Sequence, residues 1–291
     1  MKKIKKDVCA KLNLTLDVLG LGGGGYHQIE SLVASIDICD TIVVNKRKDG
    51  KITLTMKGQK VNVLPQENNA FKAASLFMQN FPTTGVDVTI KKRIPIGGGL
   101  GGSSADIAGV LIGLNELYGL GKDVSDLAAA LGSDAAYMTK GGYAVMSGRG
   151  ERVRRVDSEK TYYLLLITEN KEISAGACYK EYDSLEKKLT PTTKQAERAL
   201  QSGDDDLAIK LIKNDLGLAA QKLVPEIEFN LECLKKAGAE AVSVAGSGPT
   251  TFGLFLKEKN RNAAYKKLKR LFGDKLLKAK TVPPSQDKRN V

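Results

Sequence analysis

A glycine-rich segment at residues 95–104 constrains this chain more than any other feature. It reads Pro-Ile-Gly-Gly-Gly-Leu-Gly-Gly-Ser-Ser, after a strand-like alternation at 86–92 and before a helix predicted from about Ala105 to Tyr118. Glycines let backbone N–H groups turn around an anion, and a helix N-terminus adds unpaired donors and partial positive charge. The segment therefore predicts a phosphate-binding loop made by Pro95, Gly97, Gly98, Gly99, Leu100, Gly101, Gly102, Ser103 and Ser104.

Two well-known phosphate loops do not fit this segment. Gly97, Gly99 and Gly102 satisfy G-x-G-x-x-G, but a second helix is predicted at 124–131, where the dinucleotide fold needs a strand ending in an acidic residue. A Walker A loop ends in Gly-Lys-Ser or Gly-Lys-Thr, and neither tripeptide occurs. The loop therefore belongs to another class of phosphate-binding protein.

A single histidine, His27, restricts the chemistry of the chain. Ser-His-Asp and Cys-His machinery must use that residue, and metal sites with several histidines are excluded, whereas carboxylate and hydroxyl sites for hard cations remain open. Cys9, Cys39, Cys178 and Cys233 match no zinc spacing and no Cys-x-x-Cys pair. We expect them to be reduced, buried side chains of a cytoplasmic protein without a disulfide framework.

The charge balance suggests an anionic partner. Lysine and arginine number 45 against 33 aspartates and glutamates, a net charge of 45 − 33 = +12. Charge alone leaves nucleic acid, nucleotide and acidic metabolite open. Only 5% of residues are aromatic, which disfavours a protein that stacks nucleic-acid bases. No apolar run reaches 18 residues, so no membrane span is expected.

A strand with strict alternation is predicted over residues 8–18. Its even positions are apolar. Its odd positions place Lys11 and Asn13 together on the opposite face, which is either an ordinary solvated surface or one side of a functional site.

Asp49-Gly50 predicts a hairpin between strands at 41–45 and 51–56. A polar connection at 157–160 divides the chain into domains 1–158 and 159–291, and the end at 281–291 is expected to fray.

Four motifs in this order resemble the GHMP kinases, the superfamily of galactokinase, homoserine kinase, mevalonate kinase and phosphomevalonate kinase. Residues 95–105 resemble its second motif, Pro-x-x-x-Gly-Leu-Gly-Ser-Ser-Ala, with one extra glycine. Ala10–Leu14 with Gly25–His27 resemble the first motif, Gly132–Asp134 the Gly-Ala-Asp segment, and Gly246–Thr250 the third motif. Together they cover nearly the whole chain, which makes the resemblance specific.

Within the superfamily, the motifs are most similar to the family that phosphorylates the 2-hydroxyl of 4-diphosphocytidyl-2-C-methyl-D-erythritol in the non-mevalonate isoprenoid pathway. This resemblance implies a two-domain α+β fold, with an N-terminal ribosomal-protein-S5-like α/β domain and a C-terminal ferredoxin-like α+β domain. It also implies ATP and Mg²⁺ as cofactors and a cytidine diphosphate methylerythritol substrate, in a monomer or homodimer with no nucleic-acid or membrane partner. The metal ligands are left open.

The same resemblance assigns roles to the reacting groups. Lys11 and Asp134 are implied to be catalytic, with Asp134 accepting the proton of the acceptor hydroxyl and Lys11 stabilising the developing charge. Asn13 is implied to bind the hydroxyls of the acceptor. Asn68 matches the asparagine that contacts adenine.

The resemblance further implies a cytosine site. Tyr26, His27 and Tyr179 supply aromatic faces and polar groups for a base, while Gly246, Ser247 and Gly248 close over the phosphates or the substrate. Four alternatives stay open: a homoserine-type or mevalonate-type kinase, a divergent paralogue with another acceptor, a non-catalytic binding member of the family, and a basic nucleic-acid-binding protein.

Overall fold

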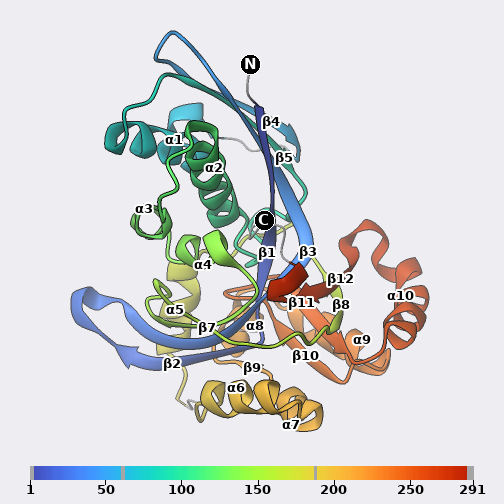
Figure 1. Cartoon of the computed structure of the whole chain (residues 1–291). Coiled ribbons are helices and arrows are strands. Elements are labelled where there is room, and N and C mark those ends of the chain that lie inside the picture. Colours follow the sequence, from blue (N-terminus) through green and yellow to red (C-terminus); the bar gives the residue numbers. More distant parts are fainter. Residues whose placement is uncertain (1–2, 60–62, 187–188, 287–291) are drawn as a thin grey trace.

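The computed structural model describes residues 3–59, 63–186 and 189–286, and its described strands join in one 12-stranded sheet (Figure 1). The strands are β1 (Lys3–Asn13), β2 (Thr15–Leu21), β3 (His27–Lys46), β4 (Ile52–Gly58), β5 (Val86–Lys92), β6 (Tyr143–Gly148), β7 (Arg152–Arg155), β8 (Tyr163–Ile167), β9 (Lys213–Asn214), β10 (Ala241–Val244), β11 (Thr251–Phe255) and β12 (Leu276–Val282).

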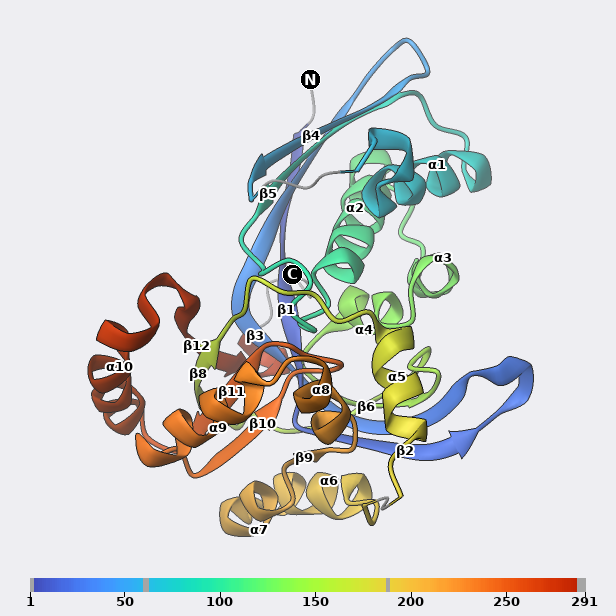
Figure 2. The ribbon, with the colours of Figure 1, turned by 180° about the vertical axis from the view of Figure 1, so that it is seen from behind.

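Helices gather around the two halves of the chain. They are α1 (Asn69–Asn80), α2 (Gly102–Tyr118), α3 (Ser125–Leu131), α4 (Ala135–Lys140), α5 (Ala175–Asp183), α6 (Thr193–Ser202), α7 (Asp205–Lys210), α8 (Gly217–Leu223), α9 (Glu226–Lys236) and α10 (Glu258–Phe272). Helix α2 packs on β1 and β3, and α9 and α10 pack on the strands of the C-terminal half, as the view from behind shows (Figure 2). No described helix has the length and apolar composition that a membrane crossing requires.

The long strand β3 organises the sheet. The strand predicted at 41–45 is only its last part, because β3 runs unbroken for 20 residues and pairs with β1, β2, β5, β6 and β12. Strand β12 near the C-terminal end pairs with β3 and β8, so the sheet is continuous between the two halves. The division between residues 158 and 159 stays a prediction.

The alternation predicted for residues 8–18 is present, divided between β1 and β2. Val8, Ala10 and Leu12 are fully buried, as expected for the apolar face. The opposite face is not solvated, because Lys11 is only 5% exposed and Asn13 only 3%. A buried ammonium needs an oppositely charged or hydrogen-bonding partner, so this face of the strand must contact other polar groups of the protein.

The hairpin predicted at Asp49-Gly50 is wrong. Strand β5 lies between β3 and β4, antiparallel to the first and parallel to the second. The residues of β5 alternate between buried and partly exposed, while those of β4 are at most half-buried, so burial favours β5 in the inner position. Arg47 binds Asp49 in the turn and Asp87 of β5 at 2.6 Å each, which fixes this arrangement.

The expectation of four reduced cysteines is also wrong. Cys9 of β1 lies directly opposite Cys39 of β3, and a disulfide joins them. Residues 30 positions apart meet here because of the strand register, which the spacing of cysteines does not reveal. Cys178 is buried and Cys233 half-buried, both with free thiols.

The end of the chain is more ordered than predicted. Thr281 and Val282, expected to fray, complete β12 and pair with Ile36 and Ser35 of β3. The burial of Thr281 and Val282 against the sheet explains their order. The rest of the predicted frayed end includes residues 287–291, which lie outside the described part of the chain.

Candidate functional site

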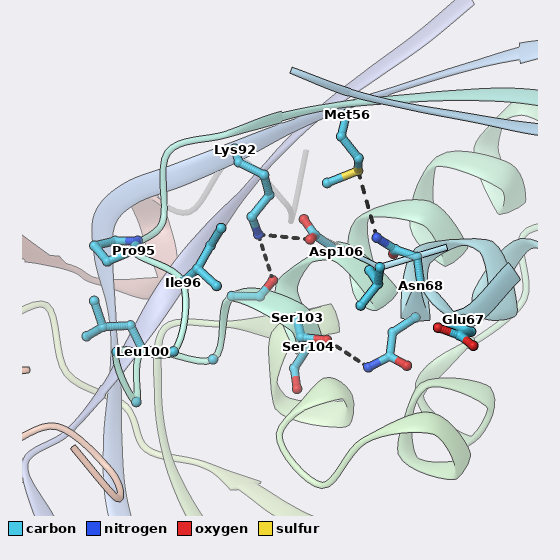
Figure 3. A pocket seen from close by; sticks show the side chains of 17 residues that line it. Met56, Glu67, Asn68, Lys92, Pro95, Ile96, Leu100, Ser103, Ser104 and Asp106 are labelled. Atoms are coloured by element: carbon cyan, nitrogen blue, oxygen red, sulfur yellow. Dashed lines mark hydrogen bonds and ion pairs between the residues drawn. The ribbon is translucent and has the colours of Figure 1, made fainter. Parts of the chain in front are cut away.

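The glycine-rich loop at 95–104 connects β5 to α2 and lines a cavity of about 380 Å³, which we call the loop cavity (Figure 3). Gly97, Gly99 and Gly101 have φ angles of +67°, +75° and +73°, which favour glycine. A Cβ atom on Gly99 would lie only 2.0 Å from the carbonyl oxygen of Ala245. Both the backbone conformation and the close approach therefore require glycine at position 99.

Helix α2 begins three residues earlier than predicted. Gly101, in the left-handed region, occupies the N-cap position, and its carbonyl accepts a hydrogen bond from Ala105 N at 2.9 Å. The first turn therefore contains Gly102, Ser103 and Ser104, so its free N–H groups lie within the loop itself. The N-terminus of α2 and the glycine loop form one continuous set of anion-binding donors.

The other side of the loop cavity is formed by residues around the start of α1. Asn68 caps that helix by accepting a hydrogen bond from Ala70 N at 2.9 Å, and Asn69 Nδ2 donates to Ser103 Oγ at 2.8 Å. The lining consists of Met56, Val63, Glu67, Asn68, Asn69, Lys92, residues 95–104 and Asp106. Every residue of the predicted phosphate-binding loop lies here, together with Asn68, the residue predicted to contact adenine.

A buried charge cluster under this cavity was not predicted. Lys92 Nζ lies 2.5 Å from Asp40 Oδ2 and 2.8 Å from Asp106 Oδ2. Burial raises the pKa of Asp106 to about 7, against the attraction of the Lys92 ammonium. Burial also lowers the pKa of Lys92, but the two carboxylates outweigh it and raise that pKa overall. The lysine therefore stays charged, and Asp106 takes up a proton more readily than an exposed carboxyl does.

A second cavity, of about 270 Å³, surrounds Lys11, and we call it the Lys11 cavity. Its lining consists of Lys11, Asn13, Leu16, Ile29, Gly99, Gly101, Ser104, Ser133, Asp134, Arg149, Ala175, Tyr179, Leu216, Gly246 and Ser247. Gly99, Gly101 and Ser104 line both cavities. A group bound in one cavity can therefore reach a group bound in the other across this part of the loop.

The predicted catalytic pair meets at this junction. Lys11 Nζ lies 3.2 Å from Asp134 Oδ2, although the two residues come from β1 and from the segment just before α4. The Lys11 side chain is buried, whereas the Asp134 side chain remains 29% exposed. Lys11 N also donates to the carbonyl of Leu100 at 3.0 Å, which ties β1 to the glycine loop. The carboxylate is thus both oriented and accessible.

Asn13 has a more structural position than the resemblance implied. Its Oδ1 accepts a hydrogen bond from Lys11 Nζ at 2.7 Å, and its Nδ2 donates to Ser31 Oγ at 2.8 Å. It lines the Lys11 cavity, but its main contacts hold the lysine. Asn13 therefore orients the ammonium of Lys11, whatever else it binds.

The predicted base-binding residues lie beside the Lys11 cavity. The His27 and Tyr179 rings stack at 4.6 Å with an interplanar angle of 15°, and His27 Nε2 lies 2.8 Å from Asp183 Oδ1. Burial raises the pKa of Tyr179, so its phenol remains neutral.

Tyr26, the third predicted base-binding residue, is exposed. The Arg149 guanidinium packs over its ring at 5.0 Å from the ring centroid. Asp183 and Arg149 were missed, although Arg149 lies within the Gly-x-Gly segment at 148–150.

The loop at Gly246, Ser247 and Gly248 closes the junction from the C-terminal half. A Cβ on Gly246 would lie 2.9 Å from Gly99 O and 3.3 Å from Lys11 Nζ. Asn214 Nδ2 donates to Gly246 O at 2.7 Å and so anchors the loop. Gly246 and Ser247 line the Lys11 cavity, whereas Gly248 packs behind them against Val244 and Ala220.

Comparison with known proteins assigns the family. Residues 68–149 match the family model described as GHMP kinases N terminal domain, and residues 196–274 match GHMP kinases C terminal. The chain belongs to the GHMP kinase family. This finding confirms the family and the α+β fold inferred from the motifs, and it makes the chain a small-molecule kinase by class.

Several relatives cover almost all of this GHMP kinase. It is 33% identical over 286 residues to the 4-diphosphocytidyl-2-C-methyl-D-erythritol kinase of Shouchella clausii, with 96% of each protein covered. It is 34% identical over 266 residues to the kinase of the same name from Brevibacillus brevis, with 89% of this chain and 90% of that protein covered.

Solved structures share the fold. A crystal structure of 4-(cytidine 5'-diphospho)-2C-methyl-D-erythritol kinase has a TM-score of 0.79 and 28% identity, covering 96% of this chain and 99% of the other. A homoserine kinase from Cytophaga hutchinsonii has a TM-score of 0.74 at 18% identity, covering 97% of this chain and 96% of the other, and it shares the fold.

Proposed function

We propose that this GHMP kinase transfers the γ-phosphoryl group of ATP to the 2-hydroxyl of 4-diphosphocytidyl-2-C-methyl-D-erythritol. The observation that carries the proposal is the meeting of two cavities at Gly99, Gly101 and Ser104, with the Lys11–Asp134 pair beside them. The relatives that bear this activity in their names support the choice of acceptor.

Each group at the junction has a defined task in this reaction. The Asp134 carboxylate accepts the proton of the acceptor hydroxyl as its oxygen bonds to phosphorus. The Lys11 ammonium, held by Asn13, stabilises negative charge on the transferring group. Phosphoryl transfer depends mainly on positioning and charge stabilisation, so this pair and the loop N–H groups suffice without a covalent intermediate.

The loop cavity fits a nucleotide triphosphate. Its glycines carry no side chain that would keep a phosphate away from the backbone N–H groups, and the N-terminus of α2 adds donors for phosphate oxygens. Among the described residues, no group of three histidine, cysteine or acidic side chains could hold a metal ion. Mg²⁺ would therefore enter with the phosphates, which is its usual mode in kinases, and would neutralise their charge.

The aromatic stack favours a nucleotide-bearing acceptor. Tyr179 lines the Lys11 cavity and stacks on His27, which offers a flat surface beside the reacting groups. A cytosine ring can stack on such a surface, whereas homoserine and mevalonate have no ring to stack. Arg149 in the same cavity can bind the diphosphate of the acceptor.

An acceptor panel tests the proposal. The purified chain is incubated with ATP, Mg²⁺ and either 4-diphosphocytidyl-2-C-methyl-D-erythritol, homoserine or mevalonate, and ADP formation is followed. We expect turnover with the first acceptor at least about 30-fold above the others, since a stacked base and a bound diphosphate each contribute about 1–3 kcal/mol and about 1.4 kcal/mol corresponds to a factor of ten. Turnover of homoserine or mevalonate alone would overturn it.

A further inference from the structure

A chain of buried hydrogen bonds starts at Lys11 and runs away from the Lys11 cavity. Lys11 Nζ donates to Asn13 Oδ1 at 2.7 Å, and Asn13 Nδ2 donates to Ser31 Oγ at 2.8 Å. The Ser31 hydroxyl in turn donates to the carbonyl oxygen of Thr15. Asn13 is only 3% exposed and Ser31 is fully buried in β3. The motifs in the sequence gave Ser31 no role.

The direction of these hydrogen bonds is fixed at both ends. The Lys11 ammonium has only donors, so the oxygen of the Asn13 amide must face it. The Thr15 carbonyl is only an acceptor, so the single hydrogen of the Ser31 hydroxyl points to Thr15. The lone pairs of Ser31 Oγ are then left for the Asn13 amide N–H. Hydrogen bonds aligned in this way polarise and strengthen one another.

The far end of the chain is held in place by its neighbours. Thr15, the first residue of β2, is fully buried. Its Oγ1 accepts from Leu32 N at 3.0 Å and shares a hydrogen bond of 2.7 Å with Thr193 Oγ1 at the start of α6. Ser31 is therefore attached to a fixed backbone carbonyl, and it can hold the Asn13 amide in one position.

The Asn13 side chain has another place to go when Ser31 does not hold it. Asn13 lines the Lys11 cavity, where water can satisfy its amide N–H. An unpaired buried N–H is costly, so loss of the serine hydroxyl favours rotation of the Asn13 side chain toward the cavity. This rotation would take Oδ1 away from Lys11 and leave the ammonium to the attraction of Asp134, 3.2 Å away.

We propose that Ser31 is a positioning residue, which holds the Asn13 amide against Lys11 and so sets where the ammonium meets the transferring phosphoryl group. This inference rests on the proposed function, because that function gives Lys11 the task of stabilising the phosphoryl charge. Ser31 is not among the residues that line either cavity, so it acts through Asn13 rather than on a substrate. A misplacement of about 1 Å can cost such a reaction about 100-fold.

The variant Ser31→Ala removes the hydroxyl and little else. We expect kcat to fall about 10- to 100-fold, with the Kd for ATP unchanged, because Ser31 does not line the loop cavity. Ser31→Cys, whose thiol is a weaker acceptor, should give an intermediate kcat. Ser243→Ala, at a buried serine of β10 that lines neither cavity, is the matched control and should keep the wild-type kcat. Wild-type kcat in both Ser31 variants would overturn the proposal.

A double-mutant cycle separates positioning from a general loss of structure. Asn13→Ala already removes the group through which Ser31 acts. Adding Ser31→Ala to it should therefore lower kcat by less than about 2-fold further. Two losses that multiply would mean that Ser31 acts independently of Asn13, which contradicts the proposal.

A crystal structure of Ser31→Ala without ligands tests the positioning separately from the reaction. We expect Asn13 Oδ1 to lie beyond about 3.5 Å from Lys11 Nζ, outside hydrogen-bonding distance. An unchanged contact at 2.7 Å would overturn the role of Ser31, whichever acceptor the enzyme uses. Absence of phosphorylation by the wild type with every acceptor would reject the proposed function instead, and this structure would still decide whether Ser31 positions Lys11.

Discussion

At the scale of single residues, the account depends on the contact between Lys11 and Asp134. Both come from separate segments of the sequence, yet their charged atoms lie 3.2 Å apart. The lysine is buried and held by Asn13, so it is positioned before any substrate arrives. Preorganisation of this kind reduces the reorganisation required when charge develops on the phosphoryl group.

Replacing Asp134 by asparagine should remove the proton acceptor while keeping the shape of the cavity. We expect kcat to fall about 100- to 10,000-fold, the usual contribution of a positioned base, with the Kd for ATP unchanged. Steady-state kinetics and direct titration of the nucleotide separate the two effects. Asp157→Asn, at an exposed position that lines neither cavity, is the matched control. A variant that keeps wild-type kcat would exclude Asp134 as the base.

The motifs predicted which residues meet but not all that supports them. Lys11, Asp134 and the glycines of the loop were identified because their spacing matches the family. Asp40, Lys92 and Asp106 were missed, because nothing in the sequence shows that positions 40, 92 and 106 converge on one ammonium. Only the register of β3 with β5, and the packing of α2 on β1 and β3, brings these three residues together.

At the scale of elements, the glycine loop combines backbone strain with close packing. Gly99 has a φ of +75°, and an added Cβ would meet Ala245 O at 2.0 Å. Gly119, at the C-cap of α2, has a similar φ of +69° but nothing within 4 Å. A comparison of substitutions at Gly99 and Gly119 therefore separates the free-energy cost of the left-handed backbone from the cost of the close approach to Ala245.

Gly99→Ala should therefore be more damaging than Gly119→Ala. We expect the second to lose about 1–2 kcal/mol of unfolding free energy from the left-handed backbone alone. The first should lose more and should also weaken ATP binding, because the loop must move away from Ala245. Urea unfolding and nucleotide titration measure both effects. Equal losses in the two variants, with ATP binding intact, would contradict the role given to the loop.

The disulfide between β1 and β3 gives a second prediction at this scale. It closes a loop across a sequence separation of 30 residues, and such cross-links typically stabilise by about 2–4 kcal/mol. Reduction should lower the unfolding free energy by about that amount, and Cys39→Ser should remove the effect of reductant. Cys233→Ser, which lacks a disulfide partner, is the control. Alkylation of all four cysteines without reductant would contradict the bridge.

Element types were easier to predict than pairings. The limits of β5 agree with the alternation at 86–92, and α2 ends at Tyr118 as predicted. The hairpin at Asp49-Gly50 failed because a turn signal is local, whereas the position of β5 between β3 and β4 depends on burial in the whole sheet. The pairing of Cys9 with Cys39 was missed for the same reason.

At the scale of the whole molecule, the site exists because distant segments converge. The glycine loop and Lys11 come from the N-terminal half, while the Gly246 loop comes from the C-terminal half and packs on Gly99. Strand β12 pairs with β3, and β9 pairs with β2, so one sheet connects the halves around the site. The loop cavity is lined by residues of the N-terminal half, whereas the Lys11 cavity is lined by residues of both halves.

The structure of a ternary complex tests the central claim most directly. The chain would be crystallised with a non-hydrolysable ATP analogue, Mg²⁺ and 4-diphosphocytidyl-2-C-methyl-D-erythritol. We predict the triphosphate on residues 97–104, cytosine against Tyr179, and the 2-hydroxyl within about 3 Å of the Asp134 carboxylate. An acceptor bound away from the Lys11 cavity, or with its 2-hydroxyl turned away from Asp134, would contradict the account.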